Sequence, residues 1–288
     1  MNRRLLRTLI AFSVLLITIG ASIYFLASHP AVGRQILTTP PPTLLTLLFL
    51  YLLFMVSLWL IFRSSLVICR AKLPIGETIL VTAYSSIINF FGPLQSGPAF
   101  RALYLKKRHK VDLKHYAAAS LVYYFFYAYF SGLCLLLGFG WQWVALGAAA
   151  GLLSVAGVLR LPITRLQKLR GTSRRGIAYT AGATLLQVSI LAIIFYIELH
   201  SINHAVGFGQ AIVYSGAANF ALFVSLTPGA IGFRESFVLL AHKLHEIPNA
   251  TVVAASLLDR GVYIAMLLLL CVFIFGSHAR RSLKRLST

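Results

Sequence analysis

The sequence predicts an all-α, polytopic membrane protein with about six spanning helices and two oppositely oriented re-entrant helical hairpins. Three observations predict this class. Hydrophobic residues form 59% of the 288-residue chain and charged residues only 11%, whereas a soluble domain has roughly 25% charged residues. Apolar runs of about 20 residues recur along the chain. Lysine and arginine gather between these runs in a pattern that indicates topology.

The apolar runs place the spanning helices in order along the chain. The first begins with a basic N-terminus like that of a signal peptide, but its apolar run is too long for a cleaved signal, so we expect a retained helix. Two further apolar stretches are each interrupted in the middle by Gly and Pro. The expected spans are 5–28, 43–69, 115–138, 142–160, 177–199 and 250–276, and the interrupted stretches are 77–108 and 208–245.

The basic residues indicate how the chain is oriented. The clusters fall on one face only if 77–108 enters and leaves the membrane on the same side, so this stretch is predicted to be a re-entrant hairpin. The same logic makes 208–245 a hairpin from the outer face, with both termini cytoplasmic and the protein in the plasma (inner) membrane. The clusters are Arg3, Arg4 and Arg7; Arg63, Arg70 and Lys72; Lys106, Lys107, Arg108, Lys110 and Lys114; Arg160, Arg165, Lys168, Arg170, Arg174 and Arg175; and Arg280, Arg281, Lys284 and Arg285.

The two interrupted stretches resemble each other, which indicates an internal repeat. Each unit reads helix, hairpin, helix, and the units start on opposite sides of the membrane. We expect repeat halves at 43–138 and 177–276 within one transmembrane domain, 1–288. Inverted repeats of this kind build secondary transporters whose site lies at the midplane. The aligned segments are Tyr84–Phe90 with Tyr214–Phe220, Gly92–Pro98 with Thr227–Gly232, Arg101 with Arg234, and Ala118–Leu121 with Ala254–Leu257.

A helix that starts inside the membrane offers unpaired N–H groups and a positive dipole end, which suit an anion such as phosphate. Gly229 and Gly232 permit tight turns there, and Arg234 can donate two hydrogen bonds to phosphate oxygens. The first hairpin repeats this with Gly97 and Arg101. The alternative is that Gly and Pro only end helices in a loop.

Asp259 and Arg260 lie about nine residues into the last helix, where charges are costly and usually face a cavity or a partner. We expect Asp259 to pair with Arg234, or Glu235 with Arg260. These residues either serve function or form a structural ion pair that fixes helix packing.

Three uncharged polar residues complete the candidate site. Asn89 and Asn219 are expected to bond the broken backbone, with direct contact to a ligand as the alternative. Tyr124 belongs to a polar stripe on the third span, which either lines a headgroup path or packs between helices. The stripe is Ser120, Tyr124, Tyr127 and Ser131.

Other patterns exclude some functions. The formal charge of +20 is explained by topology and anionic lipid, so no nucleic-acid partner is expected. No cofactor, nucleotide or metal motif is found, and His242 and His245 are assigned to an outer surface. Glu77 and Glu198 are read as ordinary charges at helix ends. The cysteines Cys69, Cys134 and Cys271 are expected to be packing residues.

The segments Thr227–Glu235 and Leu257–Arg260 resemble the signature of the lysylphosphatidylglycerol synthase transmembrane region, a family that includes the flippase-like domain of the multiple peptide resistance factor. The resemblance covers most of the chain and implies a lipid translocator. Many members carry Gly-Glu-x-x-Arg in the first hairpin, whereas Gly97–Arg101 here lacks the acid. Because the chain ends at Thr288, we expect no soluble aminoacyltransferase domain and no lysyl-lipid synthesis.

Three functions follow as hypotheses. The first is a translocase for an anionic phospholipid or a polyprenyl-phosphate-linked lipid. The second is a membrane-embedded transferase acting on a lipid-linked substrate, with Asp259 or Glu235 as acid or base. The third is a non-catalytic partner of a cell-envelope lipid enzyme. Association of the chain with further copies of itself, as a homo-oligomer, is left open.

Cysteine-accessibility mapping tests the hairpins. In a variant without the native cysteines, single cysteines at 70–76 and 106–114 should react with an impermeant reagent from the same side of the membrane, because the chain between them is predicted to turn back. Cysteines at 200–207 serve as the control and should react from the other side. Labelling of the first two loops from opposite faces would contradict the hairpin.

Overall fold

The computed structural model describes residues 30, 39–91, 96–160, 174–224 and 233–286, and every regular element in these ranges is a helix. This confirms the all-α prediction. Four of the described helices are long and apolar enough to cross a membrane, which makes this a multi-pass membrane protein. They are α3 (Pro41–Ile68), α6 (Leu113–Leu136, continued by the 3-10 turn η1 at Leu137–Phe139), α8 (Arg174–Ile202) and α12 (Asn249–Leu286).

These four helices match the spans predicted at 43–69, 115–138, 177–199 and 250–276. The last differs most, since α12 continues to Leu286. Its final turns are rich in Arg and Lys, which are good helix formers but end a hydrophobic run, so hydropathy marks the apolar segment and not the helix. The span predicted at 142–160 forms α7 (Trp141–Arg160) and stays a prediction as a span. The span predicted at 5–28 lies outside the described residues.

The first interrupted stretch forms two helices, α4 (Ile75–Phe91) and α5 (Ser96–His109). At 17 and 14 residues they are about 26 and 21 Å long, shorter than a hydrocarbon core of about 30 Å. Two hydrogen bonds join them near the break. The Asn89 side chain accepts one from the Gly97 N–H at 3.3 Å, and the Ser96 hydroxyl donates one to the Ile88 carbonyl at 2.9 Å.

Glu77 joins the far ends of the same two helices. Its carboxylate bonds the Tyr104 hydroxyl at 2.5 Å and the His109 ring at 2.7 Å, so the prediction of an ordinary boundary charge is wrong. Partial burial opposes ionisation, but these hydrogen bonds outweigh it and hold the pKa of Glu77 below its usual value. The contact therefore stabilises the α4–α5 pair at neutral pH and weakens as the carboxylate takes up a proton in acid.

The second interrupted stretch forms α9 (Phe208–Val224), α10 (Phe233–Leu240) and the short α11 (His242–His245). Helix α9 contains 17 residues and α10 only eight, so neither equals a span in length. Between α9 and α10 lie residues 225–232, which contain the Gly and Pro residues of the motif and fall outside the described residues. Each interrupted stretch thus forms more than one described helix, and the re-entrant turns stay a prediction.

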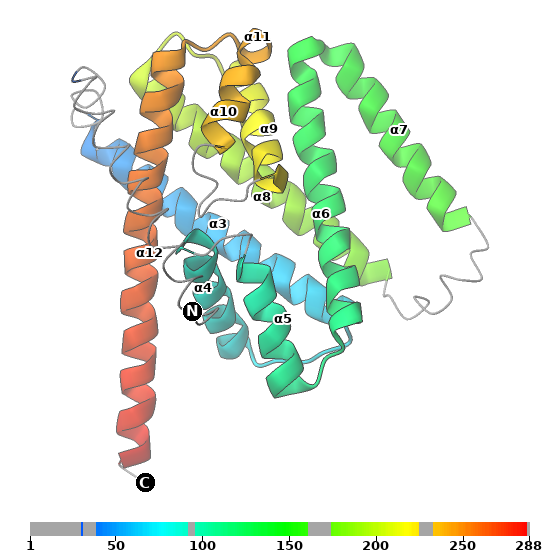
Figure 1. Ribbon diagram of the computed structural model, residues 1–288, viewed down its shortest axis with the longest axis vertical. Helices are drawn as coiled ribbons and strands as arrows, with labels where there is room; N and C mark the ends of the chain where they lie inside the picture. Colours follow the sequence, from blue (N-terminus) through cyan, green and yellow to red (C-terminus); the bar gives the residue numbers. More distant parts are fainter. Residues whose placement is uncertain (1–29, 31–38, 92–95, 161–173, 225–232, 287–288) are drawn as a thin grey trace, which may run out of the picture.

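Figure 1 shows how the two broken helices are placed. Helices α3 and α8 cross the molecule diagonally side by side. Helices α4 and α5 lie at the lower end of the view, and α9, α10 and α11 lie at the upper end, with α6 and α12 running between the two ends. The two interrupted stretches thus lie at opposite ends of one bundle.

Packing is close where α9 meets α6. A Cβ atom added at Gly216 would lie 2.6 Å from the Leu135 N atom and 2.8 Å from the Ser131 carbonyl oxygen, both backbone atoms of α6. Glycine is needed here because only a residue without a side chain lets the two backbones approach this closely.

Substitution of Gly216 tests this contact. Gly216→Ala should lower the free energy of unfolding by about 1–3 kcal/mol, because α9 or α6 must shift to admit the methyl group. Thermal unfolding in detergent, followed by tryptophan fluorescence, measures the effect. The matched control is Gly182→Ala in α8, where nothing lies within 4 Å of the added Cβ and stability should hold or rise. Equal melting temperatures for both variants would contradict the close packing.

Candidate functional site

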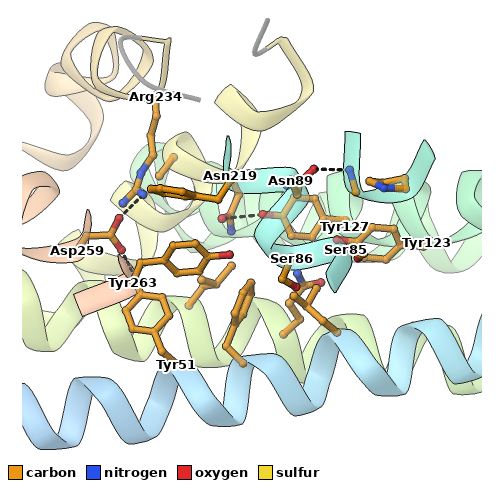
Figure 2. A pocket seen from close by; sticks show the side chains of 18 of the residues that line it. Tyr51, Ser85, Ser86, Asn89, Tyr123, Tyr127, Asn219, Arg234, Asp259 and Tyr263 are labelled. Carbon is orange, nitrogen blue, oxygen red and sulfur yellow. Dashed lines mark hydrogen bonds and ion pairs between the residues drawn. The ribbon is translucent and has the colours of Figure 1, made fainter. Parts of the chain in front are cut away.

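A cavity of about 240 Å³ lies between the two broken helices, and most of its wall is aromatic or polar. Eight helices contribute to it, from both predicted repeat halves. Figure 2 shows ten of the lining residues labelled. The wall comprises Tyr51, Phe54, Leu58, Ser85, Ser86, Asn89, Phe90, Gly97, Pro98, Arg101, Tyr123, Tyr124, Tyr127, Gln187, Leu191, Phe195, Ala218, Asn219, Arg234, Asp259, Arg260 and Tyr263.

The central feature of the wall is an ion pair between α10 and α12. Arg234 Nη1 donates to Asp259 Oδ2 at 2.5 Å, and the side chains are only 13% and 6% exposed. The Tyr51 hydroxyl of α3 donates to the other carboxylate oxygen of Asp259. The predicted pairing of Asp259 with Arg234 is confirmed. Because removal of one partner would leave a buried charge, the pair holds three helices in place.

Arg234 retains unused hydrogen-bonding capacity. Its Nε and Nη2 atoms are buried and have no hydrogen-bond partner among the described residues. The guanidinium lies 4.7 Å above the Phe195 ring, which stabilises the cation without using an N–H group. Buried N–H groups without partners are costly, so this arginine is suited to an acceptor that enters the cavity.

A second ion pair lies beside the first. Arg260 Nη2 donates to Glu235 Oε1 at 2.5 Å, and the same oxygen accepts a hydrogen bond from the Ser256 hydroxyl at 2.7 Å. The predicted pairing of Glu235 with Arg260 is therefore also confirmed. Arg260 reaches the cavity wall, while Glu235 supports it from behind.

The first broken helix places a cation in the cavity without an acid. Arg101 Nε donates to the Ser85 hydroxyl at 2.6 Å, and its guanidinium lies 5.2 Å from the centre of the Phe62 ring. Among the described residues it forms no ion pair with a carboxylate. In both halves the arginine thus covers a phenylalanine of the preceding span, Phe62 of α3 or Phe195 of α8.

The two asparagines occupy equivalent positions but bond differently. Asn89 accepts from the Gly97 N–H, as predicted for bonding of the broken backbone. Asn219 instead accepts from the Tyr127 hydroxyl at 2.9 Å and donates to Ser215, and the break that it was predicted to bond lies outside the described residues. The reason is the neighbouring helix, since Tyr127 of α6 reaches across to α9 (Figure 2).

The structure therefore brings most of the predicted site residues together. Glu235 stands behind the wall, and Gly229 and Gly232 lie outside the described residues. The residues that face the same cavity are Arg101, Arg234, Asp259, Arg260, Asn89, Asn219 and Tyr124.

Several lining residues were missed by reasoning from the sequence. Tyr51 and Tyr263 lie in apolar runs, where a tyrosine usually indicates an interface. A signal for Tyr263 was present, because the alignment of Ala118–Leu121 with Ala254–Leu257 places Tyr127 opposite Tyr263. The same alignment places Tyr123 opposite Asp259, so a tyrosine in one half replaces a carboxylate in the other.

Glu198 was predicted to be a boundary charge, and this is wrong. It is 1% exposed, and its Oε1 atom has no hydrogen-bond partner in the described part of the chain. The cause is tertiary packing, because α8 continues to Ile202 and residues of the second interrupted stretch cover the last turns of α8. Sequence periodicity carries no signal for such burial.

His245 was predicted to lie on an outer surface, and this is also wrong. It is 1% exposed; Nε2 bonds the Val238 carbonyl at 2.9 Å and Nδ1 accepts from the Ile247 N–H at 3.0 Å. With both nitrogens bound to the backbone, it fixes the turn after α10. No group of three or more metal-ligating side chains occurs within the described ranges.

These features define a multi-pass membrane protein, all-helical in its described residues, with a cavity of aromatic, polar and charged side chains between the two interrupted stretches. The family model of the lysylphosphatidylglycerol synthase TM region matches residues 9–271. The chain therefore belongs to this family, as its motifs indicated. Membership ties the protein to lipid synthesis or lipid flipping. No curated protein matches the chain.

Substitutions in the central ion pair test how much it contributes to the stability of the protein. Asp259→Asn should cost about 3–5 kcal/mol of stability, because it leaves Arg234 charged and buried. The double variant Arg234→Met/Asp259→Leu should recover most of that loss. Thermal unfolding of the purified variants checks both expectations.

The exposed pair His115–Asp112 supplies the control. Asp112→Asn keeps the helix cap and should change stability by less than about 1 kcal/mol. A double variant that is less stable than Asp259→Asn would contradict the account of the ion pair.

Proposed function

We propose that this protein is a lipid translocase that moves an anionic phospholipid or a polyprenyl-phosphate-linked lipid across the inner membrane. In this proposal the chain forms one flippase-like domain with repeat halves at 43–138 and 177–276. The α4–α5 pair is a re-entrant hairpin from the cytoplasmic face, the α9–α10 pair one from the outer face, and both termini are cytoplasmic.

The observation that carries the proposal is the surplus of buried positive charge in the cavity. Three guanidinium groups, those of Arg101, Arg234 and Arg260, face it, and only two carboxylates pair with them. The Nε and Nη2 atoms of Arg234 have no acceptor among the described residues, so their N–H groups can donate to an oxygen. A phosphodiester would supply both the missing negative charge and the missing acceptors.

The size of the cavity also favours a headgroup. Sites for whole drug-sized ligands enclose about 300–1,000 Å³. A cavity of about 240 Å³ admits a phosphate with a small substituent, while acyl or prenyl chains remain in the bilayer. The aromatic side chains of the wall offer apolar surface to the remainder of the headgroup.

The contacts of the two carboxylates, Asp259 and Glu235, favour translocation over transfer chemistry. A transferase needs a carboxylate that can accept or deliver a proton at the reacting atom. Asp259 and Glu235 are each held by an arginine and a hydroxyl group, from Tyr51 and Ser256 respectively. These contacts make them supports for the arginines.

Purified protein in liposomes tests the proposal. Wild type should move phosphatidylglycerol labelled on an acyl chain to the other leaflet faster than phosphatidylcholine, as measured by chemical quenching of the accessible label. Arg234→Gln should slow this movement by about tenfold to a hundredfold, the equivalent of one hydrogen bond to a charged group. A polyprenyl phosphate in a parallel assay distinguishes the two lipid classes.

Arg63→Gln is the matched control, because Arg63 lies over Trp59 and does not line the cavity. Equal rates for wild type, Arg234→Gln and empty liposomes with every anionic lipid would contradict translocation. A lipid of changed mass in the same liposomes would favour the transferase instead.

A further inference from the structure

Two uncharged residues of the cavity wall, Ser86 of α4 and Gln187 of α8, carry polar atoms that the proposed phosphate contacts do not use. Ser86 is 4% exposed and Gln187 is 3% exposed, and both line the cavity. Ser86 Oγ and Gln187 Oε1 are buried and have no hydrogen-bond partner among the described residues. Burial of such atoms is costly unless a ligand or a water supplies the missing bonds.

Buried polar atoms without a partner are concentrated at this cavity. Six such side-chain atoms occur within the described ranges, and four of them belong to residues of the cavity wall: Ser86 Oγ, Gln187 Oε1, and Nε and Nη2 of Arg234. The hydroxyl of Ser86 also differs from those of Thr78 and Thr82, which each donate to a carbonyl of α4 itself. The wall is therefore incomplete in its hydrogen bonds at more than one place.

Helix α8 separates Gln187 from the arginine that is suited to the phosphate. Phe195, Leu191 and Gln187 recur every four residues and all line the cavity, so they share one face of the helix. The Arg234 guanidinium lies 4.7 Å from the centre of the Phe195 ring. Gln187 lies eight residues before Phe195, or about 12 Å along the helix axis. A ligand that contacts both Arg234 and Gln187 must therefore extend beyond its phosphate.

Helix α4 places Ser86 beside the first-half arginine. Ser86 follows Ser85, whose hydroxyl accepts from Arg101 Nε at 2.6 Å. In Figure 2, Arg234 and Asp259 lie at the left of the view, whereas Ser85 and Ser86 lie farther to the right. The cavity thus offers the Arg234 guanidinium in one part and neutral polar groups in another.

The chemistry of the two residues selects the kind of group that they can bind. Gln187 Oε1 can only accept a hydrogen bond, whereas the Ser86 hydroxyl can donate and accept. Hydroxyl groups of a ligand match both residues. An ammonium group can only donate, and it would add positive charge to a cavity where three guanidinium groups meet two carboxylates. An apolar substituent would leave both residues without a partner.

We propose that Ser86 and Gln187 bind hydroxyl groups of the headgroup, so that the preferred lipid carries a substituent with several hydroxyl groups on its phosphate. A glycerol or a sugar has this chemistry, and either a glycerophospholipid or a polyprenyl-phosphate-linked lipid can present it. The inference rests on the proposed function, because a phosphate at Arg234 is what brings the substituent into the cavity.

Two lipids of equal charge test the inference. Phosphatidylglycerol and phosphatidylpropanol are both phosphodiesters with a three-carbon substituent, but only the first has hydroxyl groups on it. Wild type in phosphatidylcholine nanodiscs should bind phosphatidylglycerol about tenfold more tightly, because the other lipid leaves buried polar groups without partners. Ser86→Ala and Gln187→Leu should each reduce this preference and keep the affinity for phosphatidylpropanol.

Thermal unfolding separates this role from a structural one. Both substitutions should hold or raise the melting temperature, because each removes a buried polar atom that has no partner among the described residues. The matched control is Ser57→Ala in α3. Ser57 is also a buried serine, but it donates to the Phe54 carbonyl at 2.7 Å and does not line the cavity. This variant should keep the wild-type preference.

A second pair of lipids distinguishes the two sources of the headgroup. It consists of a polyprenyl-phosphate hexose and the corresponding polyprenyl methyl phosphate, which are also equal in charge. Preference for the hydroxylated member of either pair would support the inference and identify the class of lipid. Equal affinities within both pairs, or an unchanged preference in Ser86→Ala/Gln187→Leu, would overturn hydroxyl recognition and leave translocation standing. Failure to bind any of the four lipids would overturn both proposals.

Discussion

The buried contact between Arg234 and Asp259 is the interaction on which the site depends. It connects α10 to α12, and the Tyr51 hydroxyl extends it to α3, so three helices distant in sequence meet at one carboxylate. Charges this far from water remain ionised only when each finds a partner. The same contact fixes the direction of the guanidinium and leaves two of its nitrogens without a hydrogen-bond partner among the described residues. The Arg234–Asp259 contact thus both packs the helices together and orients the arginine for binding.

The two predicted halves place their arginines, Arg101 and Arg234, in different chemical surroundings. Each breaks a helix near an asparagine and lays an arginine over a phenylalanine of the preceding span. The second half then neutralises its arginine with Asp259, whereas the first uses the Ser85 hydroxyl and presents Tyr123 at the position equivalent to the acid. The cavity therefore gains net positive charge from its first half.

Much of this could be predicted from the sequence, because hydropathy, Gly and Pro positions and repeated motifs are local signals. They predicted four of the spans and both ion pairs, since Arg234, Glu235, Asp259 and Arg260 follow motifs in a low-charge chain. They did not give the burial of Glu198, which depends on the helix that covers it. Nor did they give the role of Tyr51, whose partner lies 208 residues away.

The unequal charge of the two halves has a mechanical consequence. The α10–α12 contact is held by buried ionic bonds, while the α4–α5 pair is held near the cavity by neutral hydrogen bonds of Asn89 and Ser96 and by the bond of Arg101 to an uncharged hydroxyl. Neutral bonds exchange with water at lower cost than buried ionic ones. The α10–α12 contact is therefore the stiffer of the two, and we expect rearrangement of the cavity wall to begin at the α4–α5 pair.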